Sequence, residues 1–433
     1  MNLIISKYTS LSVIKDSIII FFIYNNQYNT IFQSNPNKLI IIFLIIYWIL
    51  LNYILGQYDQ LYKSLHKKIS SNIFNTSIIS LSANIIYLYI NLFGEKLDIN
   101  IFMIFTFINI ILKIFFLIIL SQTIIDIFTI KNNLRRDWLV ISNKKTFDIL
   151  YMLNRNLKNF YNLKKYNKSD NSIDRNICGL IIEKDFILSD NDITYIKRIK
   201  KNNLPILKPL YWCEKYLQSS PSELQENNEL HYINDLNSSY DMRRKIKRIG
   251  DLSLSFFLLI SLLPILLVII IFLYIFQGPP IFYTQLRNGL NEKTFKIIKF
   301  RTMKNDAEIN GPQWSRKNDE RITFCGKLLR KFRLDELPQL LNVINGEMSL
   351  IGPRPERPEF DINLNQKIKN YSYRYLTKPG LSGWAQVNYR YSNNINESQN
   401  KYSYDLFYIK NQSLLIDFII LFKTIKIIFK AKG

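Results

Sequence analysis

Mostly apolar runs fill the first third of the chain. Four of them, each 15 to 20 residues long, lie at 11–25, 39–55, 74–93 and 101–120. About 20 apolar residues in a helix span a bilayer. The first run is interrupted by Lys15 and Asp16, whereas the other three are long enough. The pattern predicts four transmembrane helices within residues 1–130.

The connections between these runs differ in charge. YKSLHKK (62–68), after the second run, and KNNLRR (131–136), after the fourth, are basic. Connections rich in lysine and arginine stay on the cytoplasmic side of a membrane. We therefore expect the N-terminus and everything after residue 131 to lie in the cytoplasm.

Hydropathy falls between residues 131 and 240, where an α/β pattern replaces the apolar runs. DWLVIS (137–142), ICGLIIE (177–183) and LPILKP (204–209) have the composition of short strands. We expect a small Rossmann-like domain. Its first turn, SNKKTF, lacks the glycines that let a backbone approach a dinucleotide, so we interpret the domain as degenerate, with a regulatory or assembly role. Such a role makes self-association into a homo-oligomer a question for experiment.

A further apolar segment follows the polar linker 218–241. Five basic residues within 243–248 precede roughly 25 mostly apolar residues around Pro264. A fifth transmembrane helix is one interpretation, but it would place the basic segment that follows on the outer face, against the charge bias. Proline removes a helical hydrogen bond and bends a helix. We therefore favour a re-entrant helix over about 251–276, which breaks at Pro264 and keeps both flanks cytoplasmic.

Charge and composition narrow the functional classes. The 57 lysines and arginines exceed the 34 acidic residues, giving a net charge of +23, while 48% of the residues are hydrophobic. Nucleic-acid binding would explain the charge but not the apolar runs, whereas an anionic membrane surface and a phosphate-bearing substrate explain both. Three scattered cysteines form no CxxC pair, which argues against zinc and disulfides. With only two histidines, neither in a motif, carboxylates become the leading catalytic candidates.

The region 241–433 carries a series of motifs. They read GPPIFYTQLRNG (278–289), FKIIKFRTM (295–303), NDERITFCGKLLRKFRLDELPQLLNVINGEMSLIGPRP (318–355), KPGLSGWAQVNYR (378–390) and YDLFYIKNQSLLIDFIILFKT (404–424). In order and spacing they closely resemble the bacterial sugar transferase family, the polyprenyl-phosphate glycosyl-1-phosphate transferases. Long members of that family also carry four N-terminal spans and a Rossmann-like domain. The resemblance therefore implies a membrane protein of mixed α and α/β class with a monotopic catalytic domain at 241–433.

The resemblance also implies a reaction and a location. Family members transfer a sugar 1-phosphate from a nucleotide diphosphate sugar, usually a UDP-sugar, to undecaprenyl phosphate and release UMP. This step starts an exopolysaccharide, capsule or O-antigen repeat unit. The expected location is the bacterial inner membrane, among membrane lipids, with the catalytic domain on the cytoplasmic face. The catalytic acid pair of the family matches Asp335 and Glu336.

The residues around Asp335 suit that chemistry. Pro338 fits a first helical turn and Asn345-Gly346 a helix stop, so Asp335 falls where a helix should begin. We expect Asp335 to attack the sugar-bearing phosphate and to form a covalent aspartyl phosphosugar, which undecaprenyl phosphate then attacks. Repulsion between a carboxylate and a diphosphate calls for a hard cation. Glu336, together with Asp335, is the expected Mg²⁺ ligand.

Basic residues around the acid pair are candidates for phosphate binding. Arg330 precedes the pair and Arg354 lies in the Gly-Pro-Arg-Pro turn, and a guanidinium binds phosphate bidentately. Arg330 also fits an amphipathic interfacial helix. Lys299 and Arg301 in KFRTM are further candidates, with docking on anionic lipid as an equal alternative.

Other residues and functions keep alternatives open. Asp319 and Arg321 fit an ordinary turn with an ion pair at least as well as a substrate contact. Trp384 and Tyr389 suit stacking on uracil or sugar, although core packing explains Trp384 equally well. One rival function is a non-catalytic membrane scaffold of a glycan assembly complex, against which the acids and arginines argue. The other is a glycosyltransferase that releases UDP, which the nucleotide product would distinguish.

Overall fold

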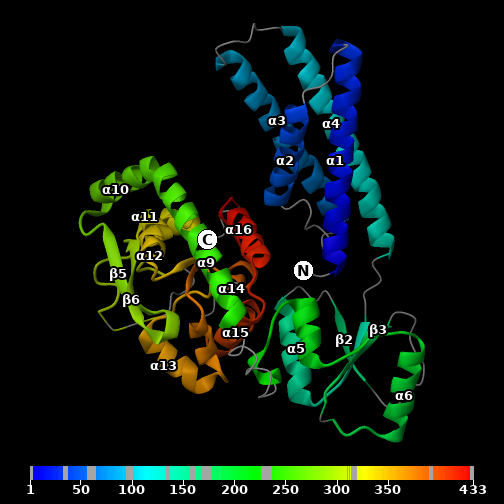
Figure 1. Cartoon of the computed structure of the whole chain (residues 1–433), viewed down its shortest axis with the longest axis vertical. Helices are drawn as coiled ribbons and strands as arrows, with labels where there is room; N and C mark the ends of the chain where they lie inside the picture. Colours follow the sequence, from blue (N-terminus) through cyan, green and yellow to red (C-terminus); the bar gives the residue numbers. More distant parts are fainter. Residues whose placement is uncertain are drawn as a thin grey trace. The chain divides into compact units, whose positions relative to one another are not determined.

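The structure is a computed structural model with two compact units, residues 1–136 and 137–433 (Figure 1). It describes residues 3–32, 38–55, 65–93, 101–132, 137–156, 161–166, 177–184, 186–225, 237–309, 311, 313, 319–389 and 394–429. The middle α/β region and the region of the family motifs belong to the same unit.

The described part of the first unit contains four helices that coincide with the four apolar runs. They are α1 (Leu3–Phe32), α2 (Lys38–Leu55), α3 (Leu65–Phe93) and α4 (Ile101–Asn132). Over the described residues, only α4, through Ile104–Ile125, is by itself long and apolar enough to cross a membrane. Membrane crossing stays a prediction for all four helices. The basic connections 62–68 and 131–136 lie wholly or partly outside the described residues and side chains.

The two charges that interrupt the first run are accommodated inside this unit. Asp16 is buried, and the Lys15 ammonium lies 3.0 Å from its carboxylate. Lys15 Nζ also donates to Gln122 Oε1 of α4 at 2.8 Å. Pairing of this kind lets a helix carry polar residues within an apolar bundle, so the interruption does not end α1.

The second unit begins with a parallel sheet. Its strands are β1 (Asp137–Ile141), β2 (Asn162–Lys165), β3 (Ile177–Ile182) and β4 (Ile206–Leu207), in the order β2-β1-β3-β4. Three of the strands lie where the sequence predicts them, whereas the short and mostly polar β2 was not predicted. Helices α5 (Lys144–Asn156) and α6 (Asp190–Lys201) follow β1 and β3. The α/β class is confirmed, and the closer likeness to a Rossmann domain stays a prediction.

A carboxylate of the chain itself lies at the start of α5, where a Rossmann domain would bind a phosphate. Glu183, just after β3, accepts hydrogen bonds from the Asn143 backbone N–H at 2.8 Å and from Thr146 Oγ1 at 2.7 Å. These donors are therefore already engaged.

The apolar segment after the linker forms two helices with a sharp bend between them (Figure 1). Helices α9 (Asn237–Ser261) and α10 (Leu263–Gln277) are inclined by 59°, with Pro264 in the first turn of α10. At the bend the Ser261 hydroxyl donates to Phe257 O at 2.7 Å, and Leu262 N donates to Leu258 O at 2.9 Å. The break at Pro264 is therefore where the sequence predicts it. Both a broken span and a re-entrant loop have such a bend, so re-entry stays a prediction.

The polar half of α9 is tied to the rest of the unit. Arg248 donates to Val343 O and Ile344 O at the end of α12 (Leu340–Asn345). Asp251, which is buried, accepts from Ser349 Oγ at 2.7 Å and from Leu350 N at 3.2 Å. These contacts fix the direction in which α9 leaves the domain.

The remaining elements surround the acid pair. They are β5 (Phe282–Asn288), β6 (Thr294–Phe300), α11 (Phe324–Lys331), the 3₁₀ helix η6 (Leu334–Gln339), β7 (Ser349–Ile351), α13 (Pro358–Lys367), the 3₁₀ helix η7 (Tyr371–Leu376), β8 (Gly380–Ser382), α14 (Trp384–Asn388), α15 (Ile395–Lys410) and α16 (Leu414–Phe429). Strands β5 and β6 form an antiparallel hairpin, and β7 pairs with β8 in parallel. A core of aromatic and aliphatic residues, including Trp384 and Met348, lies beneath them.

Trp384 belongs to this core and also connects it to the α/β region. Its ring is buried, and its indole N–H donates to Gln218 O at 3.0 Å, just after the π-helix η2 (Cys213–Leu217). Ser220 N donates to Ser403 O at 2.8 Å, and Lys410 pairs with Glu214 at 2.7 Å. Core packing is therefore the correct interpretation of Trp384, and residues 214–220 are docked on α14 and α15.

Candidate active site

The β5–β6 hairpin lies against η6, the element that carries both acids. Lys299 is on β6 and its Nζ lies 3.0 Å from Glu336 Oε1. Arg333 precedes η6 with φ of 55°, a left-handed conformation that turns the chain into the 3₁₀ helix. The acids therefore lie in the first turn of η6, and α12 follows until Gly346, whose positive φ of 84° ends it. The predicted helix stop is confirmed.

The two adjacent acids have different surroundings. Both are buried, with 8% of each residue exposed. Among the described residues, none donates a hydrogen bond to the Asp335 carboxylate, whereas Glu336 accepts from Lys299 and from both terminal nitrogens of Arg354. Glu336 is therefore fixed by two cations, and the Asp335 oxygens are available to another group.

The pKa values of the pair diverge for the same reason. Burial raises the pKa of Asp335 above its ordinary 3.8, and the charge of Glu336 raises it further. Burial also acts to raise the pKa of Glu336, but Arg354 and Lys299 outweigh it and hold that pKa well below 4.5. Adjacent carboxylates whose environments separate their pKa values are typical of sites in which the two have different roles.

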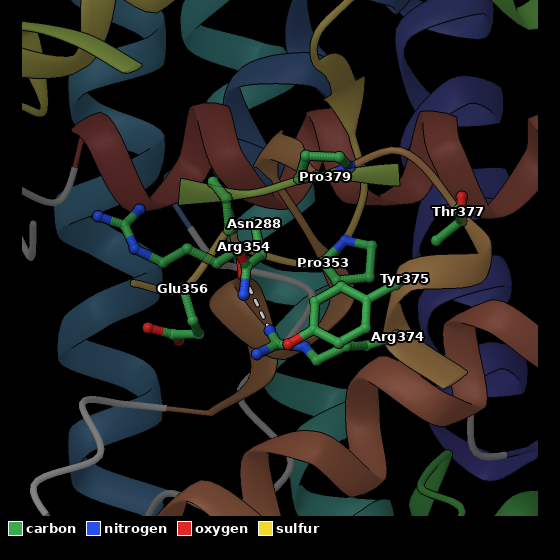
Figure 2. A pocket seen from close by; sticks show the side chains of 10 residues that line it. Asn288, Pro353, Arg354, Glu356, Arg374, Tyr375, Thr377 and Pro379 are labelled. Atoms are coloured by element: carbon green, nitrogen blue, oxygen red, sulfur yellow. Dashed lines mark hydrogen bonds between the residues drawn. The ribbon is translucent and has the colours of Figure 1, made fainter. Parts of the chain in front are cut away.

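The position of Arg354 is set by the turn that carries it. Arg354 Nη2 lies 2.6 Å from Glu336 Oε1, and its side chain is one-third exposed. Gly352 N donates to Ser382 O at 2.8 Å, and Gly380 N donates to Pro353 O at 2.8 Å, which joins the turn to β8. Arg374 Nη2 donates to Arg354 O at 2.8 Å (Figure 2). The backbone of Arg354 is thus held on both sides, and its guanidinium points away from the pocket drawn in Figure 2.

Arg330 is in the last turn of α11, just before the acid pair in the chain. Its Nε donates to Thr302 Oγ1 at 2.9 Å, and its charge acts to lower the pKa of Asp335. The close approach depends on Gly326, where a Cβ would lie 2.1 Å from Thr302 O. On the same helix Phe324 is 83% exposed. The surroundings of Arg330 therefore suit both interpretations of α11, a phosphate contact and an interfacial helix.

Arg301 is engaged differently from the other predicted phosphate ligands. Its guanidinium donates to Gln277 O, Gly278 O and Pro279 O at 2.6 to 3.0 Å, and to Asn305 Oδ1 at 2.7 Å. Arg301 itself is 7% exposed. These contacts cap the end of α10 and secure the chain that enters β5, so the structure gives Arg301 a structural role. Phosphate binding by Arg301 stays a prediction.

The structure also describes Asp319, Arg321 and Tyr389, for which the sequence left more than one interpretation open. Arg321 donates to both carboxylate oxygens of Asp319, at 2.8 and 2.6 Å, which confirms the interpretation as a turn with an ion pair. Tyr389 is half-buried and packs near Tyr404, with 6.0 Å between ring centroids.

The acids available for a metal ion are few. Within the described residues, no group of three or more histidines, cysteines and acids gathers as a ligand set. Mg²⁺ is usually held by one or two carboxylates together with substrate phosphates and waters. Asp335, whose oxygens accept no hydrogen bond from the described residues, fits that requirement. Glu336 would fit it if the metal ion replaced one of its two cationic partners, Lys299 or Arg354.

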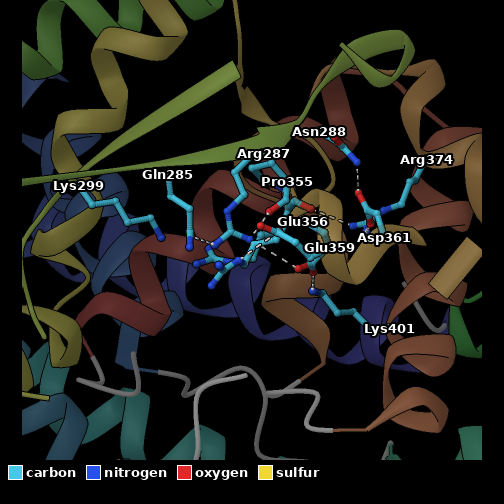
Figure 3. A network of polar contacts seen from close by, with 12 residues as sticks. Gln285, Arg287, Asn288, Lys299, Pro355, Glu356, Glu359, Asp361, Arg374 and Lys401 are labelled. Carbon is cyan, nitrogen blue, oxygen red and sulfur yellow. Dashed lines mark hydrogen bonds and ion pairs between the residues drawn. The ribbon is translucent and has the colours of Figure 1, made fainter. Parts of the chain in front are cut away.

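A second polar network, which the sequence did not indicate, adjoins Arg354 (Figure 3). At its centre Glu356 lies 2.7 Å from Lys401 and 3.8 Å from Arg287. Burial acts to raise the pKa of Glu356, but Lys401, Arg374 and Arg287 lower it to about 2. Arg374 also lies 3.2 Å from Asp405. These residues come from four separate elements and loops, and the only local signal is the high density of arginine and glutamate in PRPERPE (353–359).

Comparison with known proteins agrees with this arrangement. The family model for bacterial sugar transferases matches residues 242–431. An Aeromonas hydrophila protein named UDP-N-acetylgalactosamine-undecaprenyl-phosphate N-acetylgalactosaminephosphotransferase is 41% identical over 170 residues, 39% of this chain and 40% of that protein. The UDP-glucose:undecaprenyl-phosphate glucose-1-phosphate transferase of Escherichia coli K12 is 35% identical over 189 residues, 42% of this chain and 40% of the relative. The chain thus spans about two fifths of the length of these relatives.

A shorter relative is covered almost completely. The exopolysaccharide production protein ExoY of Sinorhizobium fredii is 37% identical over 202 residues, which make up 43% of this chain and 87% of that protein. The matched region contains the acid pair, Arg330, Arg354 and the bent helix pair. The chain belongs to the bacterial sugar transferase family.

Proposed function

We propose that this protein transfers a sugar 1-phosphate from a UDP-sugar to undecaprenyl phosphate and releases UMP. The names of its relatives support the reaction class, since they describe undecaprenyl-phosphate transferases for glucose and N-acetylgalactosamine phosphates. The observation that carries the proposal is the unequal acid pair, in which Glu336 is held by Lys299 and Arg354 while Asp335 has unengaged oxygens. The reaction would begin an exopolysaccharide or related glycan.

The proposed mechanism uses Asp335 as the nucleophile. Its carboxylate oxygen forms a bond to the phosphorus that bears the sugar, and the bond from that phosphorus to the bridging oxygen breaks. The bridging oxygen leaves on UMP with the electron pair. A phosphate oxygen of undecaprenyl phosphate then attacks the same phosphorus, and Asp335 departs as a carboxylate. Electrons and atoms balance in both steps without an external acid.

The basic residues would neutralise the diphosphate that meets this nucleophile. Arg354 and Lys299 pair with Glu336, and the charge of Arg330 acts to lower the pKa of Asp335. Positioned cations of this kind stabilise the charge that develops during phosphoryl transfer. We propose Mg²⁺ as the cofactor, held by Asp335 and Glu336, where it would reduce the repulsion between carboxylate and phosphate.

The membrane placement is part of the same proposal. The bent α9–α10 pair would enter and leave on the cytoplasmic side, so that the acid pair meets a lipid phosphate at the membrane surface. Tags at residues 240 and 290 should both report the cytoplasm. An external signal at 290 would contradict re-entry without affecting the reaction.

The function is tested with purified full-length protein, undecaprenyl phosphate, Mg²⁺ and a panel of UDP-sugars. Release of UMP with one donor is the expected result, and release of UDP would indicate a glycosyltransferase. With donor and no acceptor, the peptide that contains Asp335 should gain the mass of a sugar phosphate. Undiminished turnover in Asp335→Asn would rule out the covalent mechanism.

A further inference from the structure

Arg287 shares a face of the β5–β6 hairpin with Lys299. Arg287 pairs with Phe295 and Tyr283 pairs with Lys299 in the antiparallel register. Alternate residues of a strand point to the same side, so Tyr283, Gln285 and Arg287 lie on the side of Lys299. Figure 3 shows Lys299, Gln285 and Arg287 extending from the same side of the ribbon. Arg287 is therefore directed towards the region that contains Glu336 and Arg354.

The contacts of Arg287 leave its charge incompletely neutralised. Its Nη2 donates to Gln285 Oε1 at 2.7 Å, and its Nη1 makes a long contact of 3.3 Å to Pro355 O. The Arg287 Nε is buried and has no acceptor among the described residues. The one acid beside it, Glu356, is 3.8 Å away and is paired more closely with Lys401, at 2.7 Å.

The electrostatic surroundings lead to the same conclusion. Burial lowers the pKa of Arg287, Glu356 acts in the opposite direction, and the charges of Arg354 and Arg357 lower it again. The side chain is 14% exposed, so a ligand can reach it. A buried guanidinium with an unused donor and cationic neighbours is suited to an additional anion, and arginine binds phosphate with two parallel hydrogen bonds.

We propose that Arg287 binds the donor phosphate that departs with UMP, as a leaving-group ligand distinct from the residues around Asp335. This inference rests on the proposed function. Arg287 shares with Lys299 the face of the hairpin that lies towards the acid pair. Lys299 and Arg354 pair with Glu336, next to Asp335, whereas the Arg287 guanidinium contacts Pro355 O, on the residue after Arg354. Arg287 therefore lies beside the cations that hold Glu336 and not beside Asp335 itself. The second phosphate of a diphosphate would lie in the same way, next to the phosphate that Asp335 attacks.

A purely structural role for Arg287 makes a different prediction. In that case Arg287 would act only as a partner of Glu356, and its loss would resemble the loss of Lys401, the other cation on the same carboxylate. Lys401 lies on α15, and its Nζ donates to Glu356 Oε1 at 2.7 Å. Lys401→Met is therefore a matched control that removes a cation from Glu356 without touching the proposed phosphate site.

The test measures binding of UMP and UDP to full-length protein by titration calorimetry, together with the KM for the active UDP-sugar. Arg287→Gln should weaken UMP binding about 10-fold or more and raise the KM of the donor, as expected for loss of a charged phosphate contact. Arg287→Lys should restore part of the affinity. Lys401→Met should leave UMP binding within about twofold of wild type and change mainly the thermal unfolding temperature.

The outcomes separate the inference from the function on which it rests. UMP affinity in Arg287→Gln or Arg287→Lys equal to wild type would overturn the inference, as would the same loss of affinity in Lys401→Met. If Arg287→Gln does not fold, Arg287→Lys and Lys401→Met still decide between the two roles. Failure of wild type to bind UMP and to turn over any UDP-sugar would instead overturn the proposed function.

Discussion

Gly352 should be indispensable because the turn that presents Arg354 leaves no room for a side chain. A Cβ at this position would lie 2.3 Å from Lys378 O, 2.9 Å from Gly380 N and 3.1 Å from Pro379 C, all of them backbone atoms of the segment that enters β8. Ordinary carbon contacts begin near 3.5 Å. In Gly352→Ala the two segments must therefore separate by about 1 Å, since neither backbone can rotate out of the way.

The magnitude follows from the hydrogen bonds that join the two segments. Gly352 N to Ser382 O, Gly380 N to Pro353 O and Ser349 N to Pro379 O are each 2.8 Å long and would all be stretched or broken. At about 1 kcal/mol each, with 1–3 kcal/mol for overpacking, the loss is roughly 4–6 kcal/mol. For a unit of this size that corresponds to about 6–10 °C in the unfolding temperature.

Catalysis should suffer in the same variant. The displacement moves the backbone two residues before Arg354, whose guanidinium is 2.6 Å from Glu336. A misplacement of about 1 Å costs on the order of 100-fold in rate. The assay is UMP release at a temperature at which the variant is still folded, alongside a thermal unfolding curve.

Gly250→Ala provides the matched control. Gly250 lies within α9, and a Cβ there would meet no atom within 4 Å. Alanine favours a helix over glycine by about 1 kcal/mol, so this variant should be unchanged or slightly more stable. If Gly352→Ala unfolds within about 1 °C of wild type and keeps its activity, the close approach of the turn to β8 does not govern the site.

Three further predictions concern charge. Arg301→Lys should lose several of the carbonyl contacts that end α10, which lowers the free energy of unfolding by about 2 kcal/mol and the unfolding temperature by a few degrees. The KM of the folded fraction for donor should stay at its wild-type value if the role is structural alone, and a raised KM would support phosphate binding by Arg301. The raised pKa of Asp335 places the acid limb of kcat/KM above the usual aspartate range, and Glu336→Gln, which removes the neighbouring charge, should move that limb to lower pH. Glu356 has a pKa of about 2 against an ordinary 4.5, so above pH 4.5 it contributes stability on the order of 3 kcal/mol, which is lost as the pH falls towards 2. Lys401→Met removes a cation that lowers this pKa, so the variant should unfold at a higher pH on acid titration. An unchanged midpoint would contradict the role of Lys401 in lowering the pKa of Glu356.

The sequence was most informative where function and local pattern coincide. The proximity of Asp335, Glu336 and Arg354 could be predicted because they lie within one short segment, which runs from a helix start to the Gly-Pro-Arg-Pro turn. Strand β2 was missed because Asn162–Lys165 is short and mostly polar, and it is a strand only because β1 accepts it in parallel. The carbonyl contacts of Arg301 could not be predicted for a related reason, since the carbonyls that it caps become adjacent only after α10 has ended.

The network around Glu356 could not be predicted from any one segment. Arg287, Arg374, Lys401 and Asp405 are separated by up to 118 residues, and each is an unremarkable polar residue in its own stretch of sequence. Burial gives them their significance, because a charge removed from water must find a partner. Their positions are therefore a result of the tertiary fold.

The same reasoning explains why two neighbouring carboxylates can have different roles. Asp335 and Glu336 are adjacent carboxylates, and both become buried in the folded chain. The difference comes from elements that lie elsewhere in the sequence, because β6 supplies Lys299 and the turn after β7 supplies Arg354, and both cations pair with Glu336. Asp335 then carries the remaining burial cost together with the repulsion of its neighbour. A cation or a covalent bond to phosphorus would relieve both effects. Of the two carboxylates, Asp335 is therefore the one that binding a cation or forming such a bond would stabilise more.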